Sequence, residues 1–254
     1  MKRCAYCDKE GKLTKEHIWP KGIVKRMPEL EVKYLKSKKK FFSSELIISD
    51  VCADCNNIKL SILDNYLCKL YDLYFETYIE KEEEIIFNYD YDLLLRSLLK
   101  ITYNTSRTEN RNNNVFTQFR EYILNGGRVY KNIIIRLDLI SPSIVNGKKI
   151  YPKSARCGGV DIGINTDKFI LRMISINSYY FYIIIYENDF LSDEDENKYY
   201  QIFHKMSGVI IHPYENEIKI KHTSNIDTHS AHIDFIRNTS NAFDKYISKN
   251  NIND

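Results

Sequence analysis

The chain has 254 residues, of which 43% are hydrophobic and 28% are charged, so it is not a wholly disordered protein. This length fits one large domain or two smaller ones, and it exceeds the size at which a core needs disulfides. Residues 1–60 carry 14 Lys and Arg against 8 Asp and Glu, whereas the rest of the chain carries 23 against 26. Such a basic head indicates either a polyanionic partner or a solvated, lysine-rich face.

Membrane and secretion signals are not evident in the sequence. No apolar run approaches the roughly 20 residues that span a bilayer. The N-terminal residues Met1 to Cys4 do not begin the apolar core of a signal peptide. We therefore expect a cytoplasmic protein without a membrane partner, whose six cysteines are reduced thiols or metal ligands.

The first half of the chain alternates between short polar segments and amphipathic stretches. Residues 13–18 are typical of a short strand, which Pro20 and Gly22 end. Apolar residues then recur at three- and four-residue steps over residues 60–74 and again over residues 93–103, which predicts two helices. The acidic stretch at residues 80–84 is the best candidate for a domain boundary, and the Asn- and Arg-rich residues 105–114 favour an exposed loop.

The second half has the pattern of β-strands. β-branched and aromatic runs occupy residues 129–140, 169–176, 179–186, 208–211 and 217–221. Asn177-Ser178 between two of these runs indicates a tight hairpin. We expect an α+β domain built on an antiparallel sheet, with its tyrosines in the core, and a short helix after Asn238.

Four of the six cysteines form two CxxC pairs. Cys4 and Cys7 are one pair, and Cys52 and Cys55 are the other, with 44 residues between them. Two such turns supply four thiolates to a tetrahedral zinc ion, and a closed shell of four thiolates is structural rather than catalytic. Free thiols are the alternative. Cys68 and Cys157 have no partners in this pattern, and Cys68 fits a small core residue.

Polar residues follow each CxxC pair. Glu16 and His17 lie at the end of the first predicted strand, and Asn56 begins the helix after Cys55. A regular strand would point Glu16 and His17 to opposite faces, but at a strand end both can turn toward one site. A zinc ion that bridges the two pairs would bring this strand end close to Asn56.

The ordered pattern CxxC…EHIxPKG…CxxCNN resembles the HNH endonuclease family over roughly residues 1–65. The resemblance implies a ββα-metal fold, in which His17 is the general base and Glu16 and Asn56 bind the catalytic Mg²⁺ or Mn²⁺. It also implies that Cys4, Cys7, Cys52 and Cys55 hold a structural zinc. The fold class that follows is α+β, with a zinc-stabilised HNH module at residues 1–80 and a larger α+β domain at residues 81–254.

The residue chemistry agrees with phosphodiester hydrolysis. A histidine has a pKa suited to general-base catalysis, and carboxylate and amide oxygens are hard ligands suited to Mg²⁺. Phosphate contacts would come from nearby basic residues, namely Lys15, Lys21, Lys25, Arg26 and the cluster at residues 36–40. The family usually has Asp where this chain has Glu16, and the middle Asn of the family pattern is replaced near Ile47, so the residue that orients His17 is unassigned.

Each of these residues also has a simpler interpretation. His17 and Glu16 can be surface residues, Asn56 can be only a helix cap, with Asn57 as the rival ligand, and the lysine cluster can be a solvated loop. Trp19 fits a packing role better than base stacking. His229 and His232 have ligand-like spacing but are more often unrelated surface histidines.

We therefore expect a metal-dependent DNA endonuclease, in a setting such as restriction or phage defence by analogy with the family. One alternative is a zinc-ribbon protein that binds nucleic acid without cutting it. Another is a nuclease that acts on RNA or that a partner activates. One nuclease centre cuts one strand, so double-strand cleavage would favour a homodimer.

Overall fold

The computed structural model describes residues 2–27, 33–35, 40–42, 46–109, 113–145, 147–160, 168–204 and 206–221. The predictions for the lysine cluster at residues 36–40 lie outside this part of the chain, apart from the backbone of Lys40. The predictions for His229, His232 and the helix after Asn238 also lie outside it.

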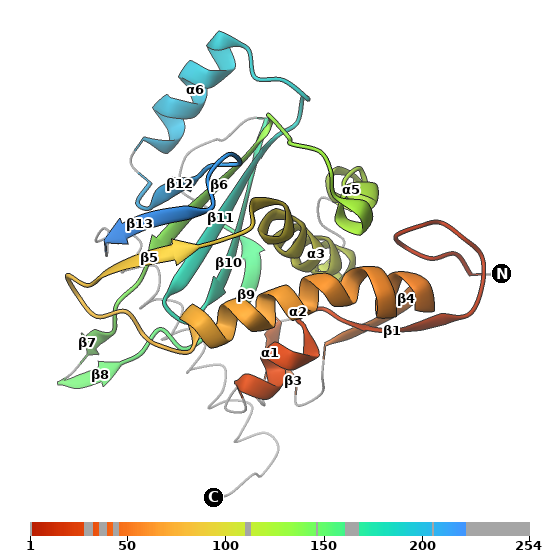
Figure 1. Ribbon diagram of the computed structural model, residues 1–254, viewed down its shortest axis with the longest axis horizontal. Helices are drawn as coiled ribbons and strands as arrows, with labels where there is room; N and C mark the ends of the chain where they lie inside the picture. The colour runs from red at the N-terminus through yellow and green to blue at the C-terminus, as the bar shows by residue number, and fades with distance from the viewer. Residues whose placement is uncertain are drawn as a thin grey trace, which may run out of the picture.

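A five-stranded antiparallel sheet forms the largest layer of the molecule, as the strand pattern predicts (Figure 1). Its strand order is β12-β6-β11-β10-β9. The hairpin of β10 and β11 matches both predicted ranges, and its turn places Asn177 at φ 49°, a left-handed conformation that Asn tolerates. The strands are β6 (Ile133–Leu139), β9 (Ala155–Gly159), β10 (Phe169–Ile176), β11 (Tyr179–Tyr186) and β12 (Val209–Ile211).

The central strand β11 is buried on both of its faces. Its odd-numbered residues, from Tyr179 to Ile185, belong to the main hydrophobic core, and its even-numbered residues, from Tyr180 to Tyr186, belong to a second core on the opposite side. This alternation follows from the two-residue period of a strand. The tyrosines here are therefore core residues, as predicted.

Helix α6 (Asp193–Phe203) covers the second core with Tyr199 and Phe203. It begins with a capping box in which Ser192 and Asp195 bond each other's backbone N–H groups. Helices α3 (Tyr91–Glu109) and α2 (Ser61–Leu70) lie on the other side of the sheet, and α3 contacts both α2 and the strands β9 and β10.

The helix predicted over residues 60–74 is confirmed, and it is longer than expected. It consists of a π-helical turn η3 (Cys55–Leu60), α2 and a second π-helical turn η4 (Tyr71–Phe75). Its buried face includes Leu63, Leu67 and Leu70, at the predicted helical spacing.

The predicted loop at residues 105–114 is mostly wrong. Helix α3 continues to Glu109, and α4 (Asn113–Thr117) begins soon after it. The hydroxyl groups of Thr105, Ser106 and Thr108 donate to carbonyls one turn earlier in the same helix, at 2.7–2.8 Å. These bonds let polar residues that are typical of turns remain helical.

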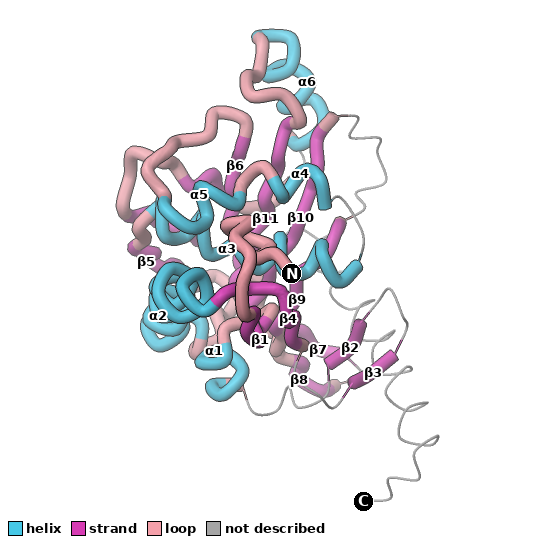
Figure 2. The backbone as a smooth tube through the Cα atoms, turned by 90° about the vertical axis from the view of Figure 1, so that its right-hand side faces the viewer, coloured by secondary structure: helices cyan, strands magenta, loops and turns pink. Residues whose placement is uncertain are grey.

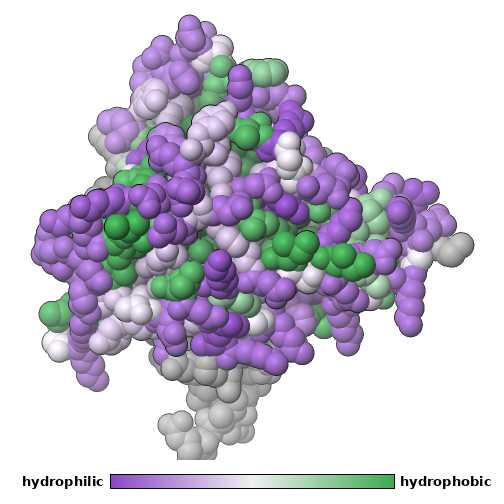
Figure 3. Space-filling model, viewed as in Figure 1, coloured by the Kyte–Doolittle hydropathy of each residue, from purple (hydrophilic) through white to green (hydrophobic). Residues whose placement is uncertain are grey.

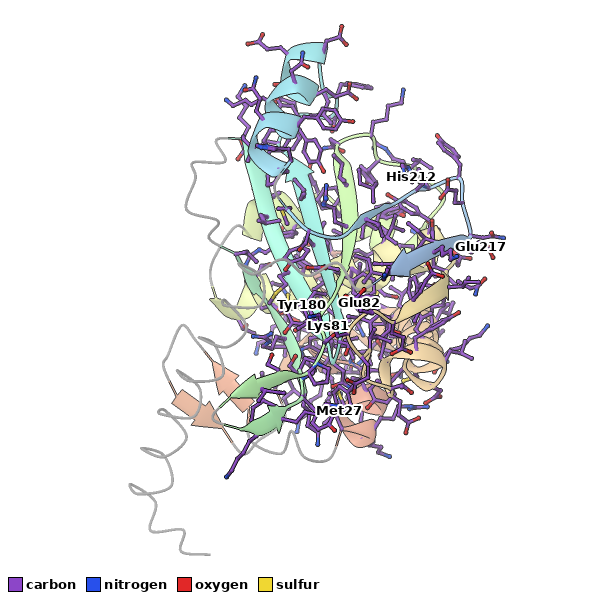
Figure 4. The ribbon with its side chains drawn as sticks, turned by 90° about the vertical axis from the view of Figure 1, so that its left-hand side faces the viewer. Met27, Lys81, Glu82, Tyr180, His212 and Glu217 are labelled. Carbon is purple, nitrogen blue, oxygen red and sulfur yellow. The ribbon has the colours of Figure 1, made fainter. Side chains whose placement is uncertain are left out.

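Small two-stranded sheets surround the main sheet. β5 (Glu84–Asn88) pairs with β13 (Glu217–Lys221), and Lys221 forms an ion pair with Glu82 in the turn before β5 (2.9 Å). Figure 4 labels Glu82, which is exposed in the turn before β5, near the middle of the view, and Glu217 at the outer end of β13. The other small elements are β2 (Lys33–Leu35) with β3 (Lys40–Phe42), β7 (Ser143–Val145) with β8 (Lys148–Ile150), and the short helix α5 (Arg120–Asn125).

One continuous hydrophobic core crosses the boundary predicted near residue 80. It runs from Cys4 and Ile23 through α2 and α3 to the inner face of the sheet and Ile220. Figure 2 shows α1 (Lys21–Arg26), α2 and the strands β1 (Leu13–His17) and β4 (Ile47–Cys52) gathered in one part of the molecule.

None of the helices in the described ranges combines the length and the hydrophobicity that a bilayer crossing requires.

We predict that residues 1–80 do not fold alone. Without α3, the fragment exposes the buried face of α2 and leaves the buried carboxylate of Glu16 without its ion-pair partner Lys100. The fragment with added zinc should lack a cooperative thermal transition and dispersed amide resonances, whereas the full chain should show both. A cooperatively folded fragment would instead establish the boundary near residue 80.

Candidate functional site

The two CxxC turns meet at one end of a two-stranded sheet. Strands β1 and β4 pair antiparallel, with Leu13 opposite Cys52. The first turn is held against β4 because the Ala5 N–H donates to the Asp50 carbonyl (2.8 Å) and the Cys52 N–H donates to Cys4 Sγ (3.3 Å). Hydrogen bonds of the sheet thus bring together two cysteine pairs that are separated by 44 residues in the sequence.

The four sulfur atoms fit a zinc ion. The sulfurs of Cys4, Cys7, Cys52 and Cys55 all lie within 4.8 Å of one another, and those of Cys7 and Cys52 are 3.7 Å apart. Zn–S bonds of about 2.3 Å in a tetrahedron place the sulfurs about 3.8 Å apart. Among the residues that the structure describes, this is the one cluster of three or more potential ligands from His, Cys, Asp and Glu. The cluster could therefore hold zinc, as the spacing predicts.

The thiols of this cluster differ in acidity. Burial raises the pKa of Cys4, but hydrogen bonds from the backbone of Cys52, Cys7 and Tyr6 outweigh it and lower that pKa to about 7. Burial and the neighbouring cysteines raise the pKa of Cys55 well above its usual range. A divalent cation favours the thiolate form of all its ligands, so zinc binding would remove this difference.

A β-bulge separates the cysteine end of the sheet from the His17 end. Thr14 pairs with Val51 and Glu16 pairs with Ile48, so two β4 residues, Ser49 and Asp50, face Lys15 alone. Beyond the bulge, β1 is regular through His17. Glu16 and His17 therefore project to opposite faces, and the expectation that both turn toward one site does not hold in this geometry.

Glu16 lies on the buried face, 2% exposed, where it faces α2 and α3. Its Oε1 is 2.7 Å from Nζ of Lys100, which is fully buried and also bonds the carboxylate of Asp64 on α2. Burial raises the pKa of Glu16, and the charge of Lys100 opposes that increase. Removal of one partner from such a buried pair costs about 3–5 kcal/mol. The Glu16 carboxylate, as it lies, does not fit the role of a ligand for catalytic Mg²⁺.

Asn56 joins the helix start to β1. Its Nδ2 donates to Thr14 Oγ1 and to the Lys15 carbonyl, both at 2.9 Å. Because both N–H groups of the amide point to β1, its Oδ1 faces away from these acceptors. His17 is half-buried at the end of the same strand. The structure thus brings Asn56 to the β1 strand and places it within one turn of the Cys55 ligand.

The predicted phosphate-binding residues differ in their surroundings. Lys15, Lys21 and Lys25 are exposed on β1 and α1. Arg26 donates from Nε and Nη2 to the two carboxylate oxygens of Asp72 in η4, at 2.6 and 2.7 Å, and this ion pair fastens α1 to the long helix. The lysines can contact a polyanion as they lie, whereas Arg26 would first have to leave Asp72.

Three residues of α3 that contact β1 and its bulge are not evident from the sequence pattern. Lys100 and Asn104 contact the end of β1, and Arg107 contacts Asp50 at the bulge (3.3 Å). Their spacing of four and three residues places them on one helix face, a pattern that could have been noticed but that usually marks a solvated face.

We predict that the purified protein contains one zinc ion per chain. Cys55→Ser should remove the metal and most of the protein's stability, because structural zinc in small sites contributes about 10–16 kcal/mol to folding. Elemental analysis and thermal unfolding would measure both effects. Cys68→Ser is the matched control and should keep the zinc, and a zinc-free wild-type protein of equal stability would contradict the assignment.

Comparisons with known proteins add no assignment to this geometry. No protein-family model matches the chain, no curated protein is significantly similar to it, and no solved structure matches its fold. The resemblance to the HNH family is therefore a hypothesis that rests on the residues of this chain and on their arrangement.

Proposed function

We propose that the chain is a zinc-stabilised nuclease of HNH type that hydrolyses DNA phosphodiester bonds at the face of β1 that carries His17. The observation that carries the proposal is the contact of Asn56 with Thr14 and Lys15. It fastens the start of a helix to the strand that ends at His17. The antiparallel pair of β1 and β4 and the helix after β4 support the proposal, because the resemblance implies two strands and a helix, although α1, β2 and β3 lie between β1 and β4 in the chain.

His17 would act as the general base. A half-buried imidazole at a strand end can take a proton from water that attacks phosphorus. A divalent ion, when bound, would supply positive charge near the phosphate. Asn56 is the residue placed to offer it an oxygen, whereas Glu16 does not fit that role.

The surface charge around β1 and α1 supports a nucleic-acid substrate. Lys15, Lys21 and Lys25 are exposed within 11 positions of sequence, and each can contact a phosphate without reading the base sequence. The proposal therefore includes DNA binding that weakens steeply as salt concentration rises.

The test is cleavage of supercoiled plasmid with Mg²⁺ or Mn²⁺ added. Wild-type protein should nick the plasmid, and His17→Ala should lower the rate at least about a hundredfold, the scale of a lost general base. His212→Ala is the matched control and should cleave like wild type, because His212 lies far from the region of α1. Figure 4 shows this separation between His212 and Met27, the residue that directly follows α1. Equal rates for wild type and His17→Ala would refute the proposed role.

A second candidate is a protein that binds nucleic acid without cutting it, and the ion pair of Glu16 with Lys100 favours it. For this candidate, filter binding should show a log–log salt slope of about −0.9 for each DNA phosphate contact. Lys21→Glu with Lys25→Glu should reduce the slope by about two, whereas no protein variant should change plasmid topology. Competition between DNA and RNA, with and without cell extract, separates the RNA-directed and partner-activated alternatives.

A further inference from the structure

Helix α3 places polar side chains directly beneath the end of β1. Lys100, Asn104 and Arg107 occupy one face of α3, although α3 belongs to the part of the chain that follows the ββα segment. All three are buried or nearly so, with Lys100 and Asn104 at 0% exposure. Buried polar side chains normally have at least one hydrogen-bond partner, so the partners of Lys100 and Asn104 show what these two residues hold.

Lys100 holds Glu16. Its ammonium group lies 2.7 Å from Glu16 Oε1 and bonds Asp64 on α2 as well. An ammonium group has three donors and one positive charge, so it can bond more than one carboxylate. Here it bonds Glu16 of β1 and Asp64 of α2. Lys100 thus occupies the cation position next to Glu16, between β1, α2 and α3.

Asn104 holds the residue beside Glu16. Its Oδ1 accepts from Tyr6 Oη (2.6 Å) and from the Arg107 guanidinium group (3.1 Å). These two donors fix the orientation of the amide, because the oxygen must face them. Nδ2 then faces β1, where it donates to the His17 carbonyl (3.3 Å) and to Glu16 Oε1 (3.4 Å).

We propose that Lys100 and Asn104 are positioning residues that fix the end of β1, and that Glu16 is the anchor they hold rather than a metal ligand. The part that concerns His17 rests on the proposed nuclease function. Asn104 reaches the His17 backbone from outside the ββα segment, so the orienting contact that the sequence left unassigned comes from α3. A metal-ligand role for Glu16 would require Mg²⁺ to displace the Lys100 ammonium group.

The first test compares thermal unfolding of wild type, Glu16→Gln, Lys100→Met and the double variant. Each single change should lower the unfolding temperature. The double variant should unfold at a higher temperature than Lys100→Met, because it removes the buried charge of Glu16 that Lys100→Met leaves unpaired, whereas the partly exposed Asp64 loses its partner in both variants. Addition of 10 mM Mg²⁺ should shift wild type and Glu16→Gln equally. A shift confined to wild type would identify Glu16 as a metal ligand and overturn the proposal.

The second test isolates Asn104. Asn104→Ala should lower kcat for plasmid nicking at least tenfold with KM within twofold, and it should shift or split the His17 imidazole resonances in a ¹H–¹³C spectrum. Ser106→Ala is the matched control on the same helix, because its buried hydroxyl donates to the Tyr103 carbonyl of α3 itself, and it should change neither readout.

The two readouts fail in different ways. If wild type does not cleave any substrate, the proposed function fails, while the His17 resonances still decide whether Asn104 positions this strand end. If those resonances, or kcat where cleavage occurs, change no more in Asn104→Ala than in Ser106→Ala, the positioning role is refuted.

Discussion

A positive charge without access to water joins the two parts of this protein. Lys100 is fully buried, and the energetic cost of removing its charge from water is offset only while Glu16 and Asp64 both face it. This requirement fixes the relative positions of β1, α2 and α3, because each element supplies one member of the cluster. Hydrophobic packing alone tolerates small shifts between helices, whereas an ion pair at 2.7 Å in a buried site does not.

The same helix also contacts the first cysteine turn. Tyr103 Oη donates to the Ala5 carbonyl (2.8 Å), and Arg107 lies over the rings of Tyr103 and Tyr6, 4.2 and 5.1 Å from their centroids. Tyr6 lies between two of the cysteines that could hold zinc. The four-cysteine cluster and the end of β1 are thus both attached to α3, and a displacement of this helix would disturb both. Figure 3 shows that the face in view is mostly hydrophilic, with hydrophobic side chains over α2 and beside β5.

Local sequence patterns predicted the elements whose cause is local. The strand pair around Asn177 and the helix that contains Leu63 and Leu67 follow from short-range spacing. The two CxxC pairs are each local patterns, and the ligand chemistry of zinc predicts that they meet although 44 residues lie between them. The contacts of Lys100 do not follow from such patterns, since its partner Glu16 is 84 positions away and a polar stripe on a helix is usually solvated. The acidic stretch at residues 80–84 had the composition of a linker, but its side chains form ion pairs with Lys149, Lys219 and Lys221. The role of the longer part in supporting the site could be found only from the three-dimensional arrangement.

The bulge at Ser49 and Asp50 has a consequence for how the chain can vary in length. Side chains of a strand alternate between faces, and the extra residue shifts the phase of β4 relative to β1 by one position. Loss of either residue would leave a single β4 residue opposite Lys15 and make the ladder regular, with Thr14 still opposite Val51 and Glu16 still opposite Ile48. Cys52 would remain opposite Leu13 and Ile47 opposite His17, so the change would be confined to the local bend and twist that a bulge adds. Single-residue deletions in this short stretch should therefore be found among relatives that retain both ends, because neither Ser49 nor Asp50 supplies one of the four sulfur atoms.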